Sequence, residues 1–192
     1  MDGNLARQYQ EERREELIGG EVVAMAPSPT WNHISAAGNI YNLFSNYLRG
    51  KYCKAIPDGF DLHLTDDDVF VPDMMVVCDR SKIRPDGVHG APDLVVEVLS
   101  RSTAKNDRTR KKDVYERCGV PEYWIVNPIE KSVEVYRLGD GKYVLQDIYT
   151  LPADWELERM TDGEKAALVT EFKCHLYDDL VIRLEDIFND FF

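Results

Sequence analysis

Two carboxylates stand in apolar segments of this sequence, where acidic side chains are uncommon unless they have a partner. Glu97 interrupts the apolar run LVVEVL at residues 94–99, and Asp73 follows Pro72 and precedes the run MMVVC. Such runs are typical of strands that are covered on both faces. If the two strands are neighbours, both carboxylates can bind one Mg²⁺ (or Mn²⁺) ion, because this kind of cation prefers oxygen ligands and can supply a water molecule for hydrolysis. Asp73 and Glu97 are therefore predicted to be catalytic and to bind metal.

A charged segment after the glutamate strand adds a third candidate. Ser and Thr residues at 100–103 can cap a helix that runs to about Cys118 and ends at Gly119. Three residues with chemically active side chains recur at four-residue spacing and so lie on one face of this helix: Asp107, Lys111 and Tyr115. A lysine beside two carboxylates can orient a water molecule or neutralise charge on a phosphate in the transition state. The basic cluster at residues 108–112 is equally typical of a solvated helix face, and the spacing leaves both interpretations open.

Three further residues are secondary candidates. Glu16 precedes a Gly-Gly turn, and His33 lies in the first turn of a predicted helix. The simpler interpretation of Glu16 is a solvated strand-edge residue, and the alternative is that it faces the metal site. The simpler interpretation of His33 is a solvent-facing or hydrogen-bonded side chain, and the alternative places it at the rim of the site. Asp93 shares a strand face with Glu97 but follows Pro92 at the start of the strand, so it ranks below the aspartate of the preceding strand.

Short strands and two main helices are expected to position these side chains. Two strands surround the Gly19-Gly20 turn, the second reaching Met25, and a helix capped by Thr30 covers residues 31–49. Apolar patterns predict further strands at residues 52–56, 60–64, 69–78, 94–99, 122–128, 132–138 and 143–150. Residues 80–91 are rich in Gly, Pro and charge and are expected to form a surface loop.

Three other segments carry weaker signals. Residues 152–173 are charged and less periodic, which is typical of an inserted helix or a loop. The run Asp66-Asp67-Asp68 is expected at a hairpin tip, where its carboxylates are solvated and do not bind metal. The apolar tail from Ile187 to Phe192 is expected to pack against the body of the protein or against a second subunit.

Composition bounds the domain organisation and location. The 192 residues, 44% of them hydrophobic, fit one domain at residues 16–192 with an N-terminal arm or helix at residues 1–15. No apolar run approaches the roughly 18–20 residues of a membrane span, and the N-terminus lacks the apolar core of a secretory signal. We therefore expect a cytoplasmic protein with no membrane partner. The four cysteines show no metal-binding spacing and are expected to be reduced and mostly buried.

The net charge of −12 argues against strong non-specific attraction to nucleic acid. It does not exclude a nuclease, because carboxylates can gather around a divalent cation and basic residues are clustered locally.

Several motifs taken together resemble the Uma-two family of restriction endonuclease-like proteins, which belongs to the PD-(D/E)XK nuclease superfamily. They are ELIGGEVVAMAP followed by His33, PDMMVV, GAPDLVVEVLS, ST, the Asp107, Lys111 and Tyr115 series, and GVPEYWIVNP. The resemblance extends from about Glu16 to the C-terminal apolar segment. It implies an α/β fold with a mixed central β-sheet flanked by helices, in which the strands of Asp73 and Glu97 are central and the EYWIVNP strand lies beside them. It also suggests homodimers.

The resemblance further implies roles for single residues. Asp73 matches the first metal-binding aspartate of the superfamily, and Glu97 matches its second acidic residue. Leu99 occupies the position of the expected lysine, so Lys111 on the following helix, ahead of Lys112, is the candidate catalytic cation. The implied activity is Mg²⁺-dependent endonucleolytic hydrolysis of DNA, with no organic cofactor. The missing strand lysine and the acidic charge keep two alternatives open: an inactive nuclease fold used for binding or assembly, and a hydrolase of another phosphate substrate.

Overall fold

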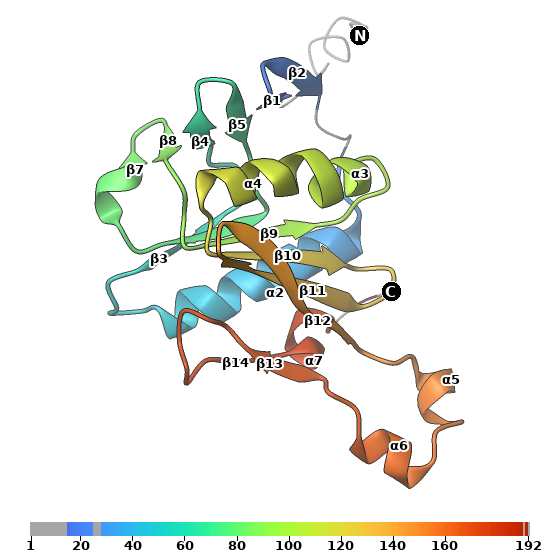
Figure 1. Cartoon of the computed structure of the whole chain (residues 1–192). Coiled ribbons are helices and arrows are strands. Elements are labelled where there is room, and N and C mark those ends of the chain that lie inside the picture. The colour runs from blue at the N-terminus through green and yellow to red at the C-terminus, as the bar shows by residue number, and fades with distance from the viewer. Residues whose placement is uncertain (1–14, 25–27, 190, 192) are drawn as a thin grey trace, which may run out of the picture.

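A six-stranded mixed sheet forms the centre of the computed structural model, which describes residues 15–24, 28–189 and 191 (Figure 1). The strand order is β12 (Lys142–Thr150), β11 (Ser132–Gly139), β10 (Glu122–Asn127), β9 (Leu94–Val98), β6 (Met74–Val77) and β3 (Lys54–Pro57). β9 and β10 are parallel, and the other neighbouring pairs are antiparallel. This arrangement confirms the predicted α/β fold with a mixed central sheet.

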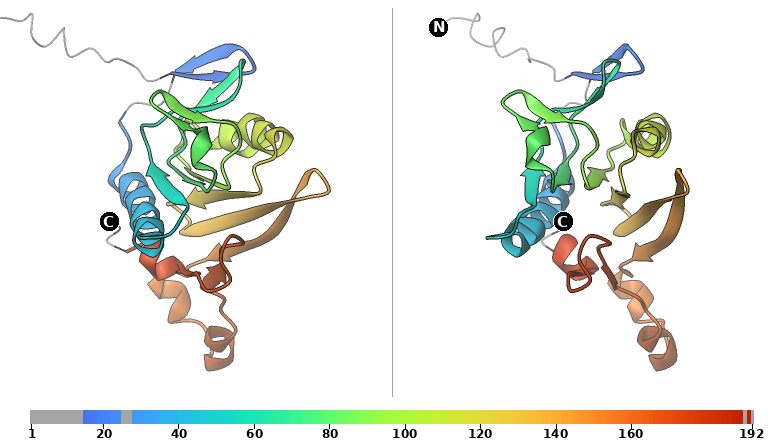
Figure 2. Two further views of the ribbon diagram at one scale, coloured as in Figure 1. Left: turned by 90° about the vertical axis from the view of Figure 1, so that its left-hand side faces the viewer. Right: turned by 60° about the vertical axis from the view of Figure 1, so that its left-hand side comes forward.

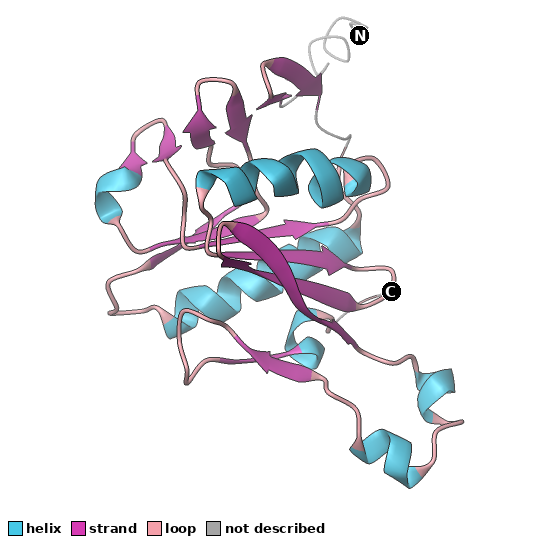
Figure 3. Ribbon diagram, in the orientation of Figure 1, coloured by secondary structure: helices cyan, strands magenta, loops and turns pink. Residues whose placement is uncertain are grey.

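Helices cover both faces of this sheet (Figures 1 and 3). The helix α2 (Trp31–Tyr47) lies on one face. A continuous helical segment lies on the other and consists of α3 (Ala104–Asn106), a π-helix (Asp107–Lys111) and α4 (Lys112–Cys118). The predicted alternation along β9 is confirmed. Its side chains divide between two cores, one with α2 and one with α4: Leu94, Val96 and Val98 in the first, and Val95 with the following Leu99 in the second.

The helix α2 begins as the sequence predicts. The Thr30 side chain accepts a hydrogen bond from the N–H of His33, and the helix ends two residues earlier than expected, ahead of the turn at Gly50 (φ +78°). Three side chains of one face are buried against the sheet: Ala36, Ile40 and Phe44.

A second six-stranded sheet packs beside the central one. Its order is β2 (Glu21–Ala24), β1 (Glu15–Ile18), β5 (Asp68–Phe70), β4 (Leu62–Thr65), β8 (Gly87–His89) and β7 (Ile83–Arg84). Figure 2 shows the β1–β2 and β4–β5 hairpins side by side. The expected loop at residues 80–91 was wrong in part, since it holds a 3₁₀ turn (Arg80–Lys82) and the β7–β8 hairpin.

The single strand predicted at residues 69–78 is also wrong, because Val71, Pro72 and Asp73 separate β5 from β6. Proline has no N–H to donate to a ladder, so the chain leaves one sheet here and enters the other. This break places Asp73 where the two sheets meet.

Asp68 corrects the expectation of three solvated aspartates. It is buried, and its Oδ1 accepts a hydrogen bond from the N–H of Gly19 at 2.8 Å. Its Oδ2 accepts from Thr65 and from Arg117, each at 2.8 Å. These contacts join the two hairpins, so the carboxylate has a structural role.

The C-terminal region consists of short elements. They are α5 (Asp154–Leu157), α6 (Asp162–Ala166), β13 (Glu171–Lys173), β14 (Val181–Arg183) and α7 (Leu184–Ile187). Ile187 and Phe188 are buried in the core that contains α2. These two residues of the tail therefore pack against the body of their own chain. The expected homodimer stays a prediction.

The cysteines correct a further expectation. Cys53 and Cys78 form a disulfide, whereas Cys118 and Cys174 are free thiols. The pairing follows from the β3–β6 register, in which Lys54 lies opposite Val77, so the next pair of residues also face each other. Sequence spacing alone carries no information on this register.

The N-terminal arm expected at residues 1–15 falls outside the described residues up to residue 14, and so does Met25, which was expected to end the second strand. Glu15 belongs to β1. None of the helices within residues 15–24 and 28–189 combines the length and the hydropathy that crossing a membrane requires.

Candidate active site

The pairing of β6 with β9 places the two predicted metal-binding carboxylates beside each other. Met74 lies opposite Val96, and one step along the antiparallel pair puts Asp73 opposite Glu97. Asp73 Oδ2 accepts a hydrogen bond of 2.6 Å from the N–H of Val98, which orients its carboxylate. Glu97 is buried in the middle of the sheet.

Lys111 is the buried cation of this site. Its Nζ lies 2.8 Å from Glu97 Oε1, 2.8 Å from Glu16 Oε1 and 3.6 Å from Asp107 Oδ1. Only 3% of its side chain is exposed. An ammonium group buried to this extent needs such partners, because its lost hydration is not otherwise compensated.

The helix that carries Lys111 is wider than the sequence predicts. Residues Asp107–Lys111 form a π-helix, a geometry that occurs often at functional sites. The expected common face is retained, because Asp107, Lys111 and Tyr115 are all buried toward the sheet. The hydroxyl of Tyr115 donates a hydrogen bond of 2.7 Å to Glu97 Oε1. Since Lys111 contacts the same oxygen, these two contacts leave Oε2 for another partner.

The secondary candidates separate into two groups. Glu16 is buried inside the site, where its Oε1 also accepts from the N–H of Val71 at 3.0 Å, so the simpler interpretation of a solvated edge residue was wrong. The cause is the pairing of β1 with β5, which carries Glu16 into the interior. His33 lies at the rim, with Nε2 3.4 Å from Asp73 Oδ1 and 16% of its side chain exposed.

Asp93 and Lys112 lie elsewhere. Asp93 Oδ2 accepts from the N–H of Cys78 at 2.7 Å, at the opposite end of the β6–β9 pair from Asp73. Lys112 Nζ lies 3.9 Å from the ring centroid of Tyr136. The two arginines of the basic cluster at residues 108–112 form ion pairs on the outer side of the helix, as a solvated face does: Arg108 with Glu134, and Arg110 with Glu21.

The charges in the site are unbalanced. Four carboxylates, from Glu16, Asp73, Glu97 and Asp107, gather around Lys111. Burial raises the pKa of Glu97 well above its usual range and raises the pKa of Asp107 as well. Burial also raises the pKa of Asp73 to about 6, although the charge of His33 opposes the shift. Burial favours the neutral form of Lys111, but the surrounding carboxylates outweigh it and raise the pKa of this residue.

The carboxylate excess has a chemical consequence. Either protons or a further cation must balance acidic groups in so dry a site. Both oxygens of Asp107 are buried and accept no hydrogen bond from the described residues. The donor set is all oxygen at Asp73 and Glu97, so the site fits a hard divalent cation.

The sequence patterns did not single out two residues of this region, Asp58 and Tyr123. Tyr123 donates a hydrogen bond of 3.0 Å to the carbonyl of Asp107. Asp58 follows β3, where Pro57 lies opposite Met74, and its charge contributes to the raised pKa of Asp73. An Asp-Gly pair directly after a predicted strand was the available signal for Asp58.

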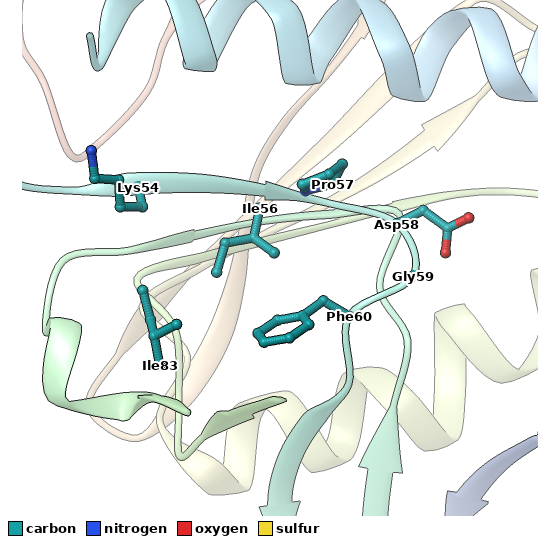
Figure 4. Close-up of a pocket in the computed structure, with 7 residues that line it drawn as sticks. All are labelled: Lys54, Ile56, Pro57, Asp58, Gly59, Phe60 and Ile83. Carbon is teal, nitrogen blue, oxygen red and sulfur yellow. The ribbon is translucent and has the colours of Figure 1, made fainter. Parts of the chain in front are cut away.

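Asp58 also borders an apolar pocket of about 440 Å³. Figure 4 shows the ring of Phe60 pointing toward Ile56 and Ile83, while the carboxylate of Asp58 points away. This pocket is separate from the acidic cluster and offers little polar chemistry, so the candidate site is the cluster around Lys111.

Comparison with known proteins decides the family. The family model of Uma2, described as "Putative restriction endonuclease", matches residues 4–168. The chain belongs to the Uma2 family. The match includes every residue of the acidic cluster and the π-helix that carries Lys111.

Two relatives and one solved structure are also similar to this chain. Two uncharacterized proteins of Synechocystis sp. are similar: sll1609, 26% identical over 161 residues (81% of this chain and 90% of that protein), and slr1290, 28% identical over 137 residues (69% and 72%). A crystal structure described as a "putative nuclease belonging to DUF820" from Anabaena variabilis superposes with a TM-score of 0.68 and 19% identity, covering 96% of this chain and 94% of that one. At this identity the structural likeness shows a shared fold.

Proposed function

We propose that this Uma2 protein is a Mg²⁺-dependent endonuclease that hydrolyses phosphodiester bonds in DNA. The observation that carries the proposal is the placement of Asp73 opposite Glu97 in a cluster with more carboxylates than cations. Membership of a family described as restriction endonucleases supports the reaction class. Mn²⁺ is expected to substitute for Mg²⁺, because both ions accept oxygen ligands.

Asp73 and Glu97 are the residues that would hold the cation. When bound, Mg²⁺ supplies Lewis-acid polarisation of a phosphate and lowers the pKa of a water molecule. The fixed hydrogen bond from Val98 to Asp73, and the Tyr115 hydroxyl on Glu97, hold the two carboxylates in place before the metal binds.

The remaining side chains would position and balance charge. Lys111 fixes Glu97 and Glu16 through two 2.8 Å contacts. We expect it to serve as the catalytic cation, because position 99 holds a leucine instead of the expected lysine. The positive charge of Lys111 would stabilise the negative charge that develops on the phosphate in the transition state. His33 is partly exposed beside Asp73, so it can carry a proton or form a hydrogen bond at the solvent-facing rim of the site.

The acidic surface affects how DNA would be bound. With a net charge of −12 the protein gains little from non-specific phosphate contacts. We therefore expect DNA binding to depend strongly on the divalent cation. A cytoplasmic location and a homodimer remain predictions of the sequence.

The test is cleavage of supercoiled plasmid, linear duplex and single-stranded DNA with Mg²⁺ or Mn²⁺. Asp73→Asn and Glu97→Gln are close in shape to the natural residues and should each lower the cleavage rate by at least about a hundredfold, the scale of losing one transition-state contact. Asp93→Asn, which changes a carboxylate at the other end of the same strand pair, should retain activity.

The outcomes separate the alternatives. Cleavage that persists in Asp73→Asn and Glu97→Gln would contradict the proposed site. Metal binding that depends on Glu97, with no cleavage of any DNA, would instead favour an inactive nuclease fold, or a hydrolase of another phosphate substrate if a small phosphodiester is cleaved.

A further inference from the structure

Two histidines and an aspartate come together on the second sheet, away from the acidic cluster. His63 on β4 and His89 on β8 stack with ring centroids 4.4 Å apart and planes 8° from parallel. His89 Nε2 lies 3.2 Å from Asp86 Oδ1, and His63 Nε2 lies 3.4 Å from the carbonyl oxygen of Asp86. One ligand atom from each of the three side chains lies within 4.8 Å of the others.

The fold builds this cluster from its backbone. β4 and β8 are parallel with His63 opposite His89, and the bond from the N–H of Gly90 to the carbonyl of His63 holds that register. A two-residue turn between Arg84 and Gly87 then brings Asp86 back over the pair.

Gly87 allows the close approach of this turn. Its φ is +154°, and a Cβ atom there would lie 2.8 Å from His63 Cδ2 and 2.6 Å from the carbonyl oxygen of Asp61. A larger residue would push the β7–β8 turn off the imidazole. The contact between turn and ring thus depends on a residue without a side chain.

The cluster is separate from the proposed nuclease site. Leu62 and Val88 are fully buried in the core between the sheet and α4, and alternation along each strand turns their neighbours His63 and His89 to the opposite face. Glu16 instead reaches Lys111 on the inner side. The histidines border an open pocket of about 450 Å³, so an ion can reach them from solvent.

We propose that His63, Asp86 and His89 bind a divalent transition-metal ion of the zinc type. Two imidazoles and one carboxylate suit Zn²⁺, Co²⁺ or Ni²⁺ and do not suit Mg²⁺, which favours oxygen ligands. Around a tetrahedral Zn²⁺ the ligand atoms lie about 3.3 Å apart. Asp86 Oδ1 and His89 Nε2 are already 3.2 Å apart, and the ligand nitrogen of His63, which lies within 4.8 Å of both ligand atoms, has to move closer to them when the ion binds. The ion ties the β7–β8 hairpin to β4 and leaves one position for water.

The test is calorimetric titration of Zn²⁺ into the full chain and its variants, with Co²⁺ absorption as a second readout. His63→Ala and His89→Ala should each raise the Zn²⁺ dissociation constant of the proposed site by at least about tenfold. Losing only a residue that hydrogen-bonds to a metal ligand costs about that much affinity, and losing a ligand should cost more. His175→Ala is the matched control, because His175 is an exposed histidine outside the cluster. Its hydrogen bond to Glu122 comes from the backbone N–H, which the variant retains. This control should bind as the natural protein does.

The same comparison in a Glu97→Gln background distinguishes this site from the acidic cluster. The histidine-dependent site should persist there, and Zn²⁺ should raise the thermal unfolding midpoint only of proteins that keep both histidines. Binding that is unchanged in His63→Ala and His89→Ala, or lost equally in His175→Ala, would overturn the proposal. Neither result depends on whether the protein cleaves DNA.

Discussion

Replacing Lys111 with methionine tests how the acidic cluster is held together. At an effective dielectric constant of about 20, each 2.8 Å contact with Glu97 or Glu16 contributes roughly 6 kcal/mol of gross Coulomb attraction. Most of this offsets the lost hydration of the buried ammonium. Removing the lysine leaves the carboxylates buried without a cation, so Lys111→Met should lower the free energy of unfolding by about 3–5 kcal/mol at pH 7.5.

Urea denaturation monitored by circular dichroism measures this loss. The loss of stability caused by Lys111→Met should be smaller at pH 5.5. At that pH the unpaired carboxylates take up protons in the folded state, so the protein no longer buries their negative charge. Adding Glu97→Gln should restore part of the stability, because one buried charge fewer remains. The coupling between the two substitutions should be between about 0.5 and 3 kcal/mol.

Lys112→Met is the control, since this neighbouring lysine lies over an aromatic ring at the helix surface. Its cost should be about 0.5–1 kcal/mol. A cost of Lys111→Met no greater than that of Lys112→Met, or an equal loss of stability at both pH values, would refute the ionic role of Lys111.

Three further predictions follow from the contacts. The pKa of Asp73 in the folded, metal-free protein is raised from 3.8 to about 6, so the contribution of this group to stability is lost as the pH rises through about 6. Below pH 6, protons compete with the metal ion for this carboxylate. Calorimetry should therefore show that Mn²⁺ binds about tenfold more weakly at pH 5 than at pH 7, and equal affinities would contradict this prediction. The Cys53–Cys78 disulfide closes a loop with a sequence separation of 25. In oxidising buffer, Cys53→Ser should therefore lower the free energy of unfolding by about 3 kcal/mol. In reducing buffer the variant and the natural protein should be equally stable, because both then lack the disulfide. Tyr115→Phe removes the hydroxyl that contacts Glu97 and should cost roughly 1–2 kcal/mol in urea denaturation, whereas no change would show that the contact contributes nothing.

The strand carrying Glu97 was predictable because its pattern is local. A continuous apolar run with one charge indicates a strand covered on both faces, and alternation assigns each side chain to a face. The helix face of Lys111 was predictable for the same reason, since four-residue spacing survives even the π-helical geometry. Both features depend on residues close together in the chain.

The features that sequence reasoning missed depend on pairing between distant strands. Glu16 enters the site only because β1 pairs with β5, and the Cys53–Cys78 disulfide exists only because of the β3–β6 register. Pro72 was visible in the sequence, but the change of sheet that it permits was not. Local patterns fix which face a side chain takes, whereas register decides which other side chain it meets.

The most direct test of the proposed metal site is a crystal structure of the protein grown with Mn²⁺. Anomalous scattering should place one ion between Asp73 and Glu97, about 2.1 Å from a carboxylate oxygen of each, close to the distance that Mg²⁺ adopts. A structure from crystals grown above pH 7 at saturating Mn²⁺, with both carboxylates well ordered and no ion between them, would contradict the account.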